Sequence, residues 1–276
     1  MPRPGNDKTT HKIFFFIFIL TCLTSVNAFS QPKNFAAQEE KLAKLYSKMV
    51  SFFHEDHDSL VLYSKKFDMD LKRFIKSNPG TMKYDFNKLS KEENICQIQT
   101  SSDGNLRIYS WDTEIGAAQH VFKSIYQWKG NGKIFSDIGD VGEDDGKDEL
   151  CTNMHTVMIG NKAYYLIIKV SVGSGRFVGQ SISAYRIEGE KLLDTVTVFK
   201  TKTETLNTII VNTDNFNVVD DYNQNEGITY DEQRKIVSIP LVNDKQALTN
   251  NYLLYKLKGR YFEYIGVEKG GSSSKK

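Results

Sequence analysis

The stretch ICQIQTSSDGNLRIYSW, residues 95–111, predicts a β-hairpin, and this hairpin indicates the fold class. Two runs rich in Ile, Thr, Tyr and Trp, Ile95 to Ser101 and Asn105 to Trp111, flank the pair Asp103-Gly104. Such residues favour strands, and Asp-Gly accepts the positive φ that a tight hairpin turn requires. We therefore expect two antiparallel strands here.

The same pattern continues through the rest of the chain. From about Met82, short runs of Ile, Val, Tyr, Phe and Thr alternate with Gly, Asn and Asp, which is typical of an antiparallel β protein. Further hairpin turns are predicted at Gly130-Asn131-Gly132, Gly160-Asn161, Glu188-Gly189-Glu190, Asp231-Glu232-Gln233 and Lys258-Gly259. Successive hairpins give a meander that buries one face as a curved sheet, a barrel or a sandwich. A propeller is the alternative, but no residues recur at fixed offsets to support it.

Two amphipathic helices are predicted before the strands. Ala36 to Glu55 and Ser59 to Lys76 both carry apolar residues at steps of three and four, and Pro79-Gly80 ends the second helix. The predicted fold class is therefore α+β, mostly β, with a helical hairpin packed on an antiparallel meander. The expected units are residues 29–80 for the helical hairpin, 81–268 for the β domain and 269–276 (KGGSSSKK) for a flexible tail.

The first residues, 1–28, have the pattern of a secretory signal peptide. Basic residues precede the apolar block from Ile13 to Leu20, and small residues follow at Val26-Asn27-Ala28. A membrane span needs about 20 apolar residues, more than this block provides. We expect a secreted, periplasmic or cell-envelope protein without a stable transmembrane span after cleavage. Lipidation at Cys22 is not expected, because Ile19-Leu20-Thr21 lacks the small residue that precedes such a cysteine.

Signal removal changes the charge of the chain. The whole chain has 36 basic and 34 acidic residues, and residues 1–28 hold three of the basic ones (Arg3, Lys8, Lys12) and one acidic one (Asp7), which leaves 33 of each. A protein that binds nucleic acid or anionic membranes normally has a basic excess. The composition therefore argues against both as the main partner.

The two cysteines outside the predicted signal peptide are Cys96 and Cys151. An even number in an oxidising compartment favours a disulfide, because disulfides persist there. We predict that they are bonded; the alternative is two separate buried thiols.

An acidic segment, DIGDVGEDDGKDE, runs from Asp137 to Glu149. Calcium binds hard oxygen ligands in flexible loops rich in Asp and Gly, although the spacing here is not that of an EF-hand. The candidate calcium ligands are Asp137, Asp140, Asp144, Asp145 and Asp148. The alternative is a solvated acidic loop, and no other cofactor is predicted.

Motifs for catalysis are weak. His54 and His57 lie in an acidic cluster, but their spacing is not that of the zinc-protease helix, and a polar turn between the helices is the simpler interpretation. The serine-hydrolase motif G-x-S-x-G is absent from the sequence. No catalytic residue is predicted, and the balance is against an enzyme.

Aromatic residues supply the candidate ligand-binding site. Arg107, Tyr109 and Trp111 alternate on one predicted strand, while Tyr126 and Trp128 share parity on the next. If these faces coincide and are exposed, they form a stacking platform suited to sugar rings or an apolar partner. The alternative is that aromatic residues at period two simply form the core.

Together these patterns favour an exported, non-catalytic binding or interaction module whose partner is a glycan or a protein. One alternative is an extracytoplasmic hydrolase, which needs carboxylates or histidines that converge in a deep cleft. The other is a structural component of the cell envelope.

Overall fold

The structure, a computed structural model, describes Met1 and residues 32–116, 119–137, 149–173, 177–214 and 227–270. It begins with two antiparallel helices, α1 (Pro32–Val50) and α2 (His57–Ser77). The Asp56 side chain caps α2 by accepting hydrogen bonds from the backbone N–H groups of Asp58 and Ser59. Two short helical segments, η1 (Pro79–Lys83) and η2 (Lys88–Glu92), lead from α2 to the strands.

The strands form three sheets, in which all pairs except one are antiparallel. The first sheet has the order β1 (Cys96–Thr100), β2 (Leu106–Asp112), β3 (Phe122–Gly130), β4 (Lys133–Asp137). The middle sheet has the order β11 (Thr208–Asp214), β7 (Phe177–Glu188), β6 (Lys162–Val172), β5 (Leu150–Ile159), with β8 (Lys191–Leu193) paired to β7. The last sheet has the order β10 (Thr205–Leu206), β9 (Phe199–Lys200), β15 (Tyr261–Lys269), β14 (Leu248–Lys258), β13 (Ile236–Val242), β12 (Thr229–Asp231). The parallel pair is β15 with β9.

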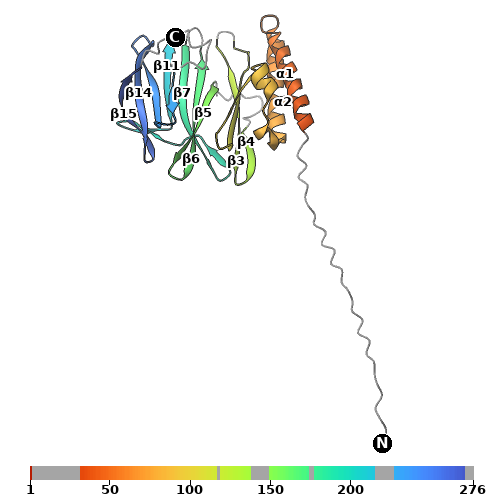
Figure 1. The fold of residues 1–276 in the computed structure, drawn as a ribbon. Coiled ribbons are helices and arrows are strands. Elements are labelled where there is room, and N and C mark those ends of the chain that lie inside the picture. The colour runs from red at the N-terminus through yellow and green to blue at the C-terminus, as the bar shows by residue number, and fades with distance from the viewer. Residues whose placement is uncertain (2–31, 117–118, 138–148, 174–176, 215–226, 271–276) are drawn as a thin grey trace, which may run out of the picture.

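The helices and the three sheets stack as four layers, in that order, across Figure 1. One apolar core joins α1 and α2 to the first sheet and includes Phe67 and Trp111. A second joins the first and middle sheets through Ile108 and Ile167. A third joins the middle and last sheets around Phe199. The predicted class, a helical hairpin packed on antiparallel β structure, is confirmed.

The predicted disulfide between Cys96 and Cys151 is wrong, because both cysteines are free thiols in the structure. Cys96 belongs to the core between the helices and the first sheet, whereas Cys151 belongs to the core between the first and middle sheets. The two side chains therefore lie in different layers. Burial raises the pKa of Cys151 to about 12 and that of Cys96 further.

Among the helices of the described segments, none combines the length and apolar character that crossing a membrane requires.

Candidate functional site

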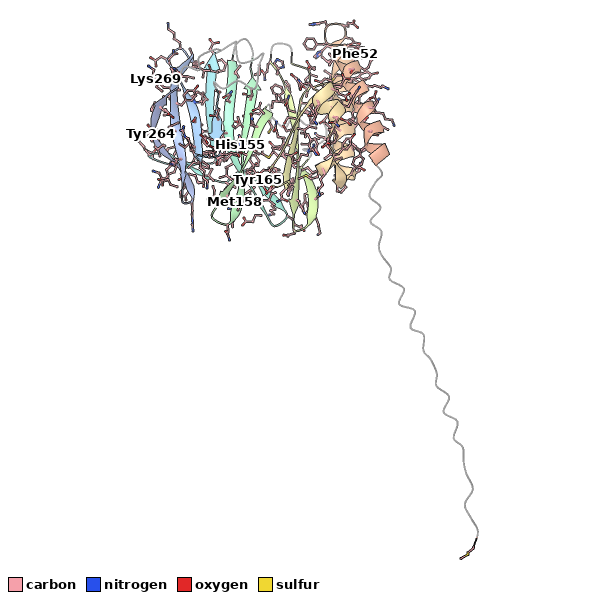
Figure 2. The ribbon with its side chains drawn as sticks, in the orientation of Figure 1. Phe52, His155, Met158, Tyr165, Tyr264 and Lys269 are labelled. Atoms are coloured by element: carbon pink, nitrogen blue, oxygen red, sulfur yellow. The ribbon has the colours of Figure 1, made fainter. Side chains whose placement is uncertain are left out.

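Several hairpin turns gather at one end of the molecule, which we call the hairpin end. The turns that follow β3, β5, β7 and β14 lie there, at the lower ends of the strands as drawn in Figure 1. In Figure 2, Met158 near the end of β5 marks this end and Lys269 marks the opposite one. Gly160, Gly189 and Gly259 adopt left-handed φ angles of 63°, 62° and 59° in these turns. Glycine adopts this conformation without steric cost, which allows the tight turns that bring the strands together.

A cavity of about 590 Å³ lies between the middle and last sheets at the hairpin end. We call it the larger cavity. Its volume is within the range of small-ligand sites. It is lined by Ile159, Gly160, Asn161, Lys162, Tyr164, Arg186, Thr197, Gly259, Arg260 and Tyr261. Three of these side chains are cationic and none is acidic.

Arg186, from β7, is held in place at the wall of the larger cavity. Its guanidinium donates to the Tyr164 hydroxyl at 3.0 Å and to the Glu188 carboxylate at 2.8 Å, and it lies over the Tyr164 ring at 5.5 Å. The hydrogen bond to Tyr164 and, to a smaller extent, the hydrogen bond to Glu188 raise the pKa of Arg186 above its ordinary value. Its Nε is buried and has no hydrogen-bond partner among the described residues. The two hydrogen bonds fix the orientation of the guanidinium at the cavity wall.

The other two cations of the larger cavity are more exposed. Lys162 forms an ion pair with Glu188 at 3.4 Å, while Arg260 forms none with any described residue. Arg186 and then Lys162 hold the pKa of Glu188 below its ordinary value, so Glu188 is ionised and neutralises part of their charge. A net positive charge remains on the cavity wall.

A smaller cavity of about 360 Å³ adjoins the larger one. It lies at the edge between the first and middle sheets and also uses Lys162 and Arg186. The Tyr165 hydroxyl donates to Asp103 at 2.9 Å on its wall. Its lining consists of Asp103, Asn105, Lys129, Lys162, Ala163, Tyr165, Arg186, Ile187, Glu188 and Gly189.

The turns around both cavities, together with the strand ends beside them, carry more basic than acidic side chains. Their basic residues are Lys129, Lys133, Lys162, Arg186, Lys191, Lys258 and Arg260, and their acidic residues are Asp103, Glu188 and Glu190. A concave site with one predominant sign of charge attracts ligands of the opposite sign. The hairpin end therefore favours anionic ligands.

The predicted aromatic platform does not form, because the two aromatic rows lie on opposite faces of the first sheet. Tyr109 pairs with Ile125, and Tyr126 pairs with Ile108, so the rows are out of register by one residue. Tyr109 and Trp111 are buried against the helices, and Tyr126 is buried against the middle sheet. The alternative, that these aromatic residues form the core, is confirmed for these three.

The other two residues of the predicted platform have different surroundings. Arg107 is buried and donates to the backbone oxygen of Thr81 at 3.0 Å. Trp128 is half-buried, and its Nε1 donates to the backbone oxygen of Glu190 at 3.0 Å in the turn after β7. Trp128 therefore lies at the hairpin end, where its hydrogen bond holds the turn after β7, but it does not line either cavity.

Most of the predicted calcium segment lies outside the described residues, namely Asp140, Asp144, Asp145 and Asp148; Asp137 ends β4. His54 lies in the turn between α1 and α2, as the polar-turn interpretation predicts. Within the segments that the structure describes, no group of three or more His, Cys, Asp or Glu side chains is placed to hold a metal ion.

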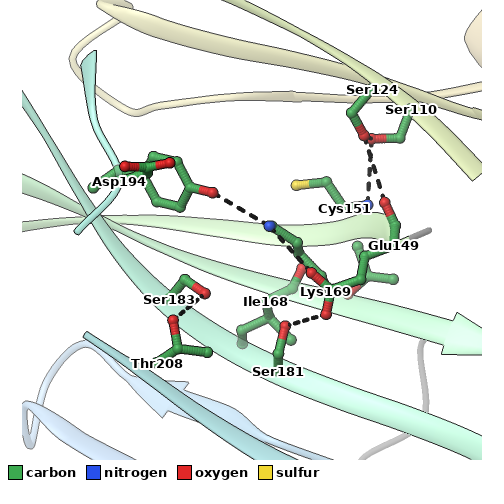
Figure 3. A network of polar contacts seen from close by, with 12 residues as sticks. Ser110, Ser124, Glu149, Cys151, Ile168, Lys169, Ser181, Ser183, Asp194 and Thr208 are labelled. Carbon is green, nitrogen blue, oxygen red and sulfur yellow. Dashed lines mark hydrogen bonds and ion pairs between the residues drawn. The ribbon is translucent and has the colours of Figure 1, made fainter. Parts of the chain in front are cut away.

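A polar network lies between the first and middle sheets, toward the end opposite the hairpin end (Figure 3). Lys169 donates to Glu149 at 3.2 Å and to the Tyr185 hydroxyl at 3.3 Å, and Ser181 donates to Glu149 at 2.7 Å. Burial lowers the pKa of Lys169, but the opposite effect of Tyr185 and Glu149 is larger. The pKa of Lys169 is therefore raised. Because the lysine is charged and paired, it is not suited to act as a base. The network joins two strands of the middle sheet to the residue before β5.

A second cluster of ionisable groups follows β2. His120 Nδ1 forms a hydrogen bond with the Asp112 carboxylate, and Tyr46 donates to Glu114 Oε1 at 3.2 Å. Glu114 has a left-handed φ of 59°, which is uncommon for glutamate. Burial, and then the charge of Asp112, raise the pKa of Glu114. An oriented histidine beside a carboxyl group of raised pKa has the components of acid–base chemistry.

The sequence predicts the turns of the hairpin end but does not show that they line two cavities. The available signal was the basic residues directly beside turn glycines, in Gly160-Asn161-Lys162 and Lys258-Gly259-Arg260. Only the packing of the middle sheet against the last sheet brings these turns together. Comparison with family models, curated proteins and solved structures gave no match for this chain.

Proposed function

We propose that this protein is an exported, non-catalytic binding module, and that its ligand carries an anionic group that enters the larger cavity. One observation carries the proposal: Lys162, Arg186 and Arg260 converge on a cavity of about 590 Å³. Charge-assisted hydrogen bonds from such groups to a carboxylate, sulfate or phosphate are stronger than neutral ones.

The walls of the larger cavity support a binding role in two further ways. Arg186 is fixed by Tyr164 and Glu188 before any ligand arrives, which lowers the entropic cost of binding. Tyr164 and Tyr261 present half-buried rings and hydroxyl groups that can contact the non-ionic part of a ligand. The proposal of export depends on the signal-peptide pattern of residues 1–28.

Binding of the purified protein to an array of neutral, uronate-bearing, sulfated and phosphorylated glycans tests the ligand class. We expect binding to anionic glycans. Arg260→Gln removes an exposed cation of the larger cavity and should weaken binding about tenfold or more, because it removes a charge-assisted contact. Arg73→Gln is the matched control, since Arg73 is an exposed arginine on α2.

Equal binding by the wild type and Arg260→Gln, or preference for neutral glycans, contradicts the proposal. Export is tested separately by fractionating cells that produce the full chain. Loss of residues 1–28 from an extracytoplasmic protein supports it, and an unprocessed cytosolic protein contradicts it.

The second candidate function is an extracytoplasmic hydrolase, and the Asp112, Glu114 and His120 cluster favours it. In this role Asp112 orients His120 as general base toward water, and Glu114 serves as general acid. Nitrophenyl esters, phosphates and glycosides are suitable probes. Hydrolysis that His120→Ala abolishes and Arg260→Gln retains supports this candidate, whereas hydrolysis that survives His120→Ala contradicts it.

A further inference from the structure

The two cavities at the hairpin end share a wall, since Lys162 and Arg186 line both. We propose that they form adjacent subsites for consecutive units of an acidic oligosaccharide. This inference rests on the proposed function and extends the ligand from a single anionic group to an oligosaccharide with several sugar units.

The dimensions of the cavities suit this ligand. Volumes of about 360 and 590 Å³ both fall in the range of small-ligand sites, so each holds a sugar ring. The smaller cavity faces Asn105 and Lys129 from the first sheet, and the larger one faces Arg260 from the last sheet. An oligosaccharide that occupies both cavities therefore crosses the edge of the middle sheet.

The chemistry of the walls combines cations with hydrogen-bond acceptors. Lys129, Lys162 and Arg260 suit carboxylate or sulfate groups. Glu188 can accept hydrogen bonds from hydroxyl groups, as ionised carboxylates do. A ligand that alternates anionic groups with hydroxyl groups satisfies both kinds of side chain, and an acidic sugar chain has this composition.

Other polyanions fit less well. A nucleic acid carries a phosphate at every unit, and the acidic residues among the cations (Asp103, Glu188 and Glu190) oppose such continuous charge. An anionic membrane is broad and attracts a basic patch on a convex or flat surface. Here the cations line two concave cavities, which a membrane surface does not enter.

Titration calorimetry with galacturonic acid and its di-, tetra- and hexamer tests this inference. We expect the tetramer to bind at least about tenfold more tightly than the monomer, because its second contact is intramolecular. Lys129→Gln, which changes only the smaller cavity, should remove this gain of the tetramer over the monomer. Lys65→Gln, an exposed lysine on α2, is the matched control and should change neither affinity.

The outcomes separate this inference from the proposed function. A monomer that binds as tightly as the tetramer overturns the inference and leaves the single anionic site. No binding by the uronates or by any anionic glycan overturns both. Tight binding to vesicles of anionic phospholipid, together with no dependence on oligosaccharide length, overturns the inference in favour of a membrane surface. Each variant must retain the wild-type melting temperature.

Discussion

Arg107 illustrates how one polar residue specifies the packing of two layers. Its guanidinium and the Tyr109 hydroxyl both donate to the backbone oxygen of Thr81 at 3.0 Å, and the Gln127 side chain donates to Thr81 Oγ1 at 3.0 Å. These buried groups form a shared network, which fixes η1 on the first sheet. Burial lowers the pKa of Arg107. Its guanidinium also lies within cation–π distance of two aromatic rings, at 5.5 Å from the Phe86 ring and 5.4 Å from the Tyr109 ring.

Trp111 provides a stability prediction at the residue scale. Its side chain is 1 % exposed and its ring contacts Phe67 of α2 edge-on, so Trp111→Ala leaves a cavity between two layers. We expect the free energy of unfolding to fall by about 3–5 kcal/mol, measured by urea denaturation. Trp128→Ala is the matched control and should cost less, since Trp128 is half-buried. An equal loss in both variants contradicts the core role.

Glu114 provides a prediction about pH. Burial and Asp112 raise its folded-state pKa above the value of about 4.3 expected in the unfolded chain. The folded state therefore holds this proton more tightly, and wild-type stability falls as pH rises through the folded-state pKa. Glu114→Gln keeps the acceptor for Tyr46 and removes the charge. The variant should be more stable than the wild type at pH 7, and the difference in melting temperature should vanish below about pH 4.

The control for this prediction is Glu55→Gln, at an exposed glutamate in the turn between the helices. It should show no such pH-dependent gain. A wild type that is more stable than Glu114→Gln at pH 7 contradicts the argument.

At the scale of elements, the reactivity of the two cysteines tests whether β1 and β5 lie in different layers. Cys96 of β1 and Cys151 of β5 are both buried free thiols, and burial raises both pKa values. We expect both thiols to react with a thiol reagent after unfolding without reductant, and to react slowly in the folded protein. If both resist the reagent after unfolding without reductant, the cysteines are bonded and this placement is wrong.

The helices and most hairpins were predictable because their signals are local. The apolar spacing in α1 and α2 and the turn glycines act over a few residues. The structure describes fifteen strands, of which β8, β9, β10 and β12 have only two or three residues each. Such short strands leave too little pattern to detect.

Register and layering were not predictable in the same way. The parity of Trp111 and Tyr126 is visible in the sequence, but the pairing of Tyr109 with Ile125 determines which face each row occupies. The candidate site depends on contacts over a still longer range, because Lys162, Arg186 and Arg260 come from segments far apart in the chain. These residues are neighbours only because the sheets stack, and local sequence patterns do not show how sheets stack.

At the scale of the whole molecule, overall neutrality conceals an uneven distribution of charge. Residues 29–276 have equal numbers of basic and acidic residues, yet the turns of the hairpin end are predominantly basic. Exposed charges are screened beyond about 8–10 Å at physiological salt. We therefore expect the affinity for an acidic glycan to fall as salt rises from low to physiological concentration. Affinity that does not depend on salt contradicts an electrostatic site.

Backbone amide NMR during titration with tetragalacturonic acid shows whether the hairpin end is the binding site. We expect the shift changes to concentrate at residues 160–164, 186–189 and 259–261, with a second group at 103–105 and 129. Shift changes concentrated at residues 112–120, or on α1 and α2, contradict this binding site.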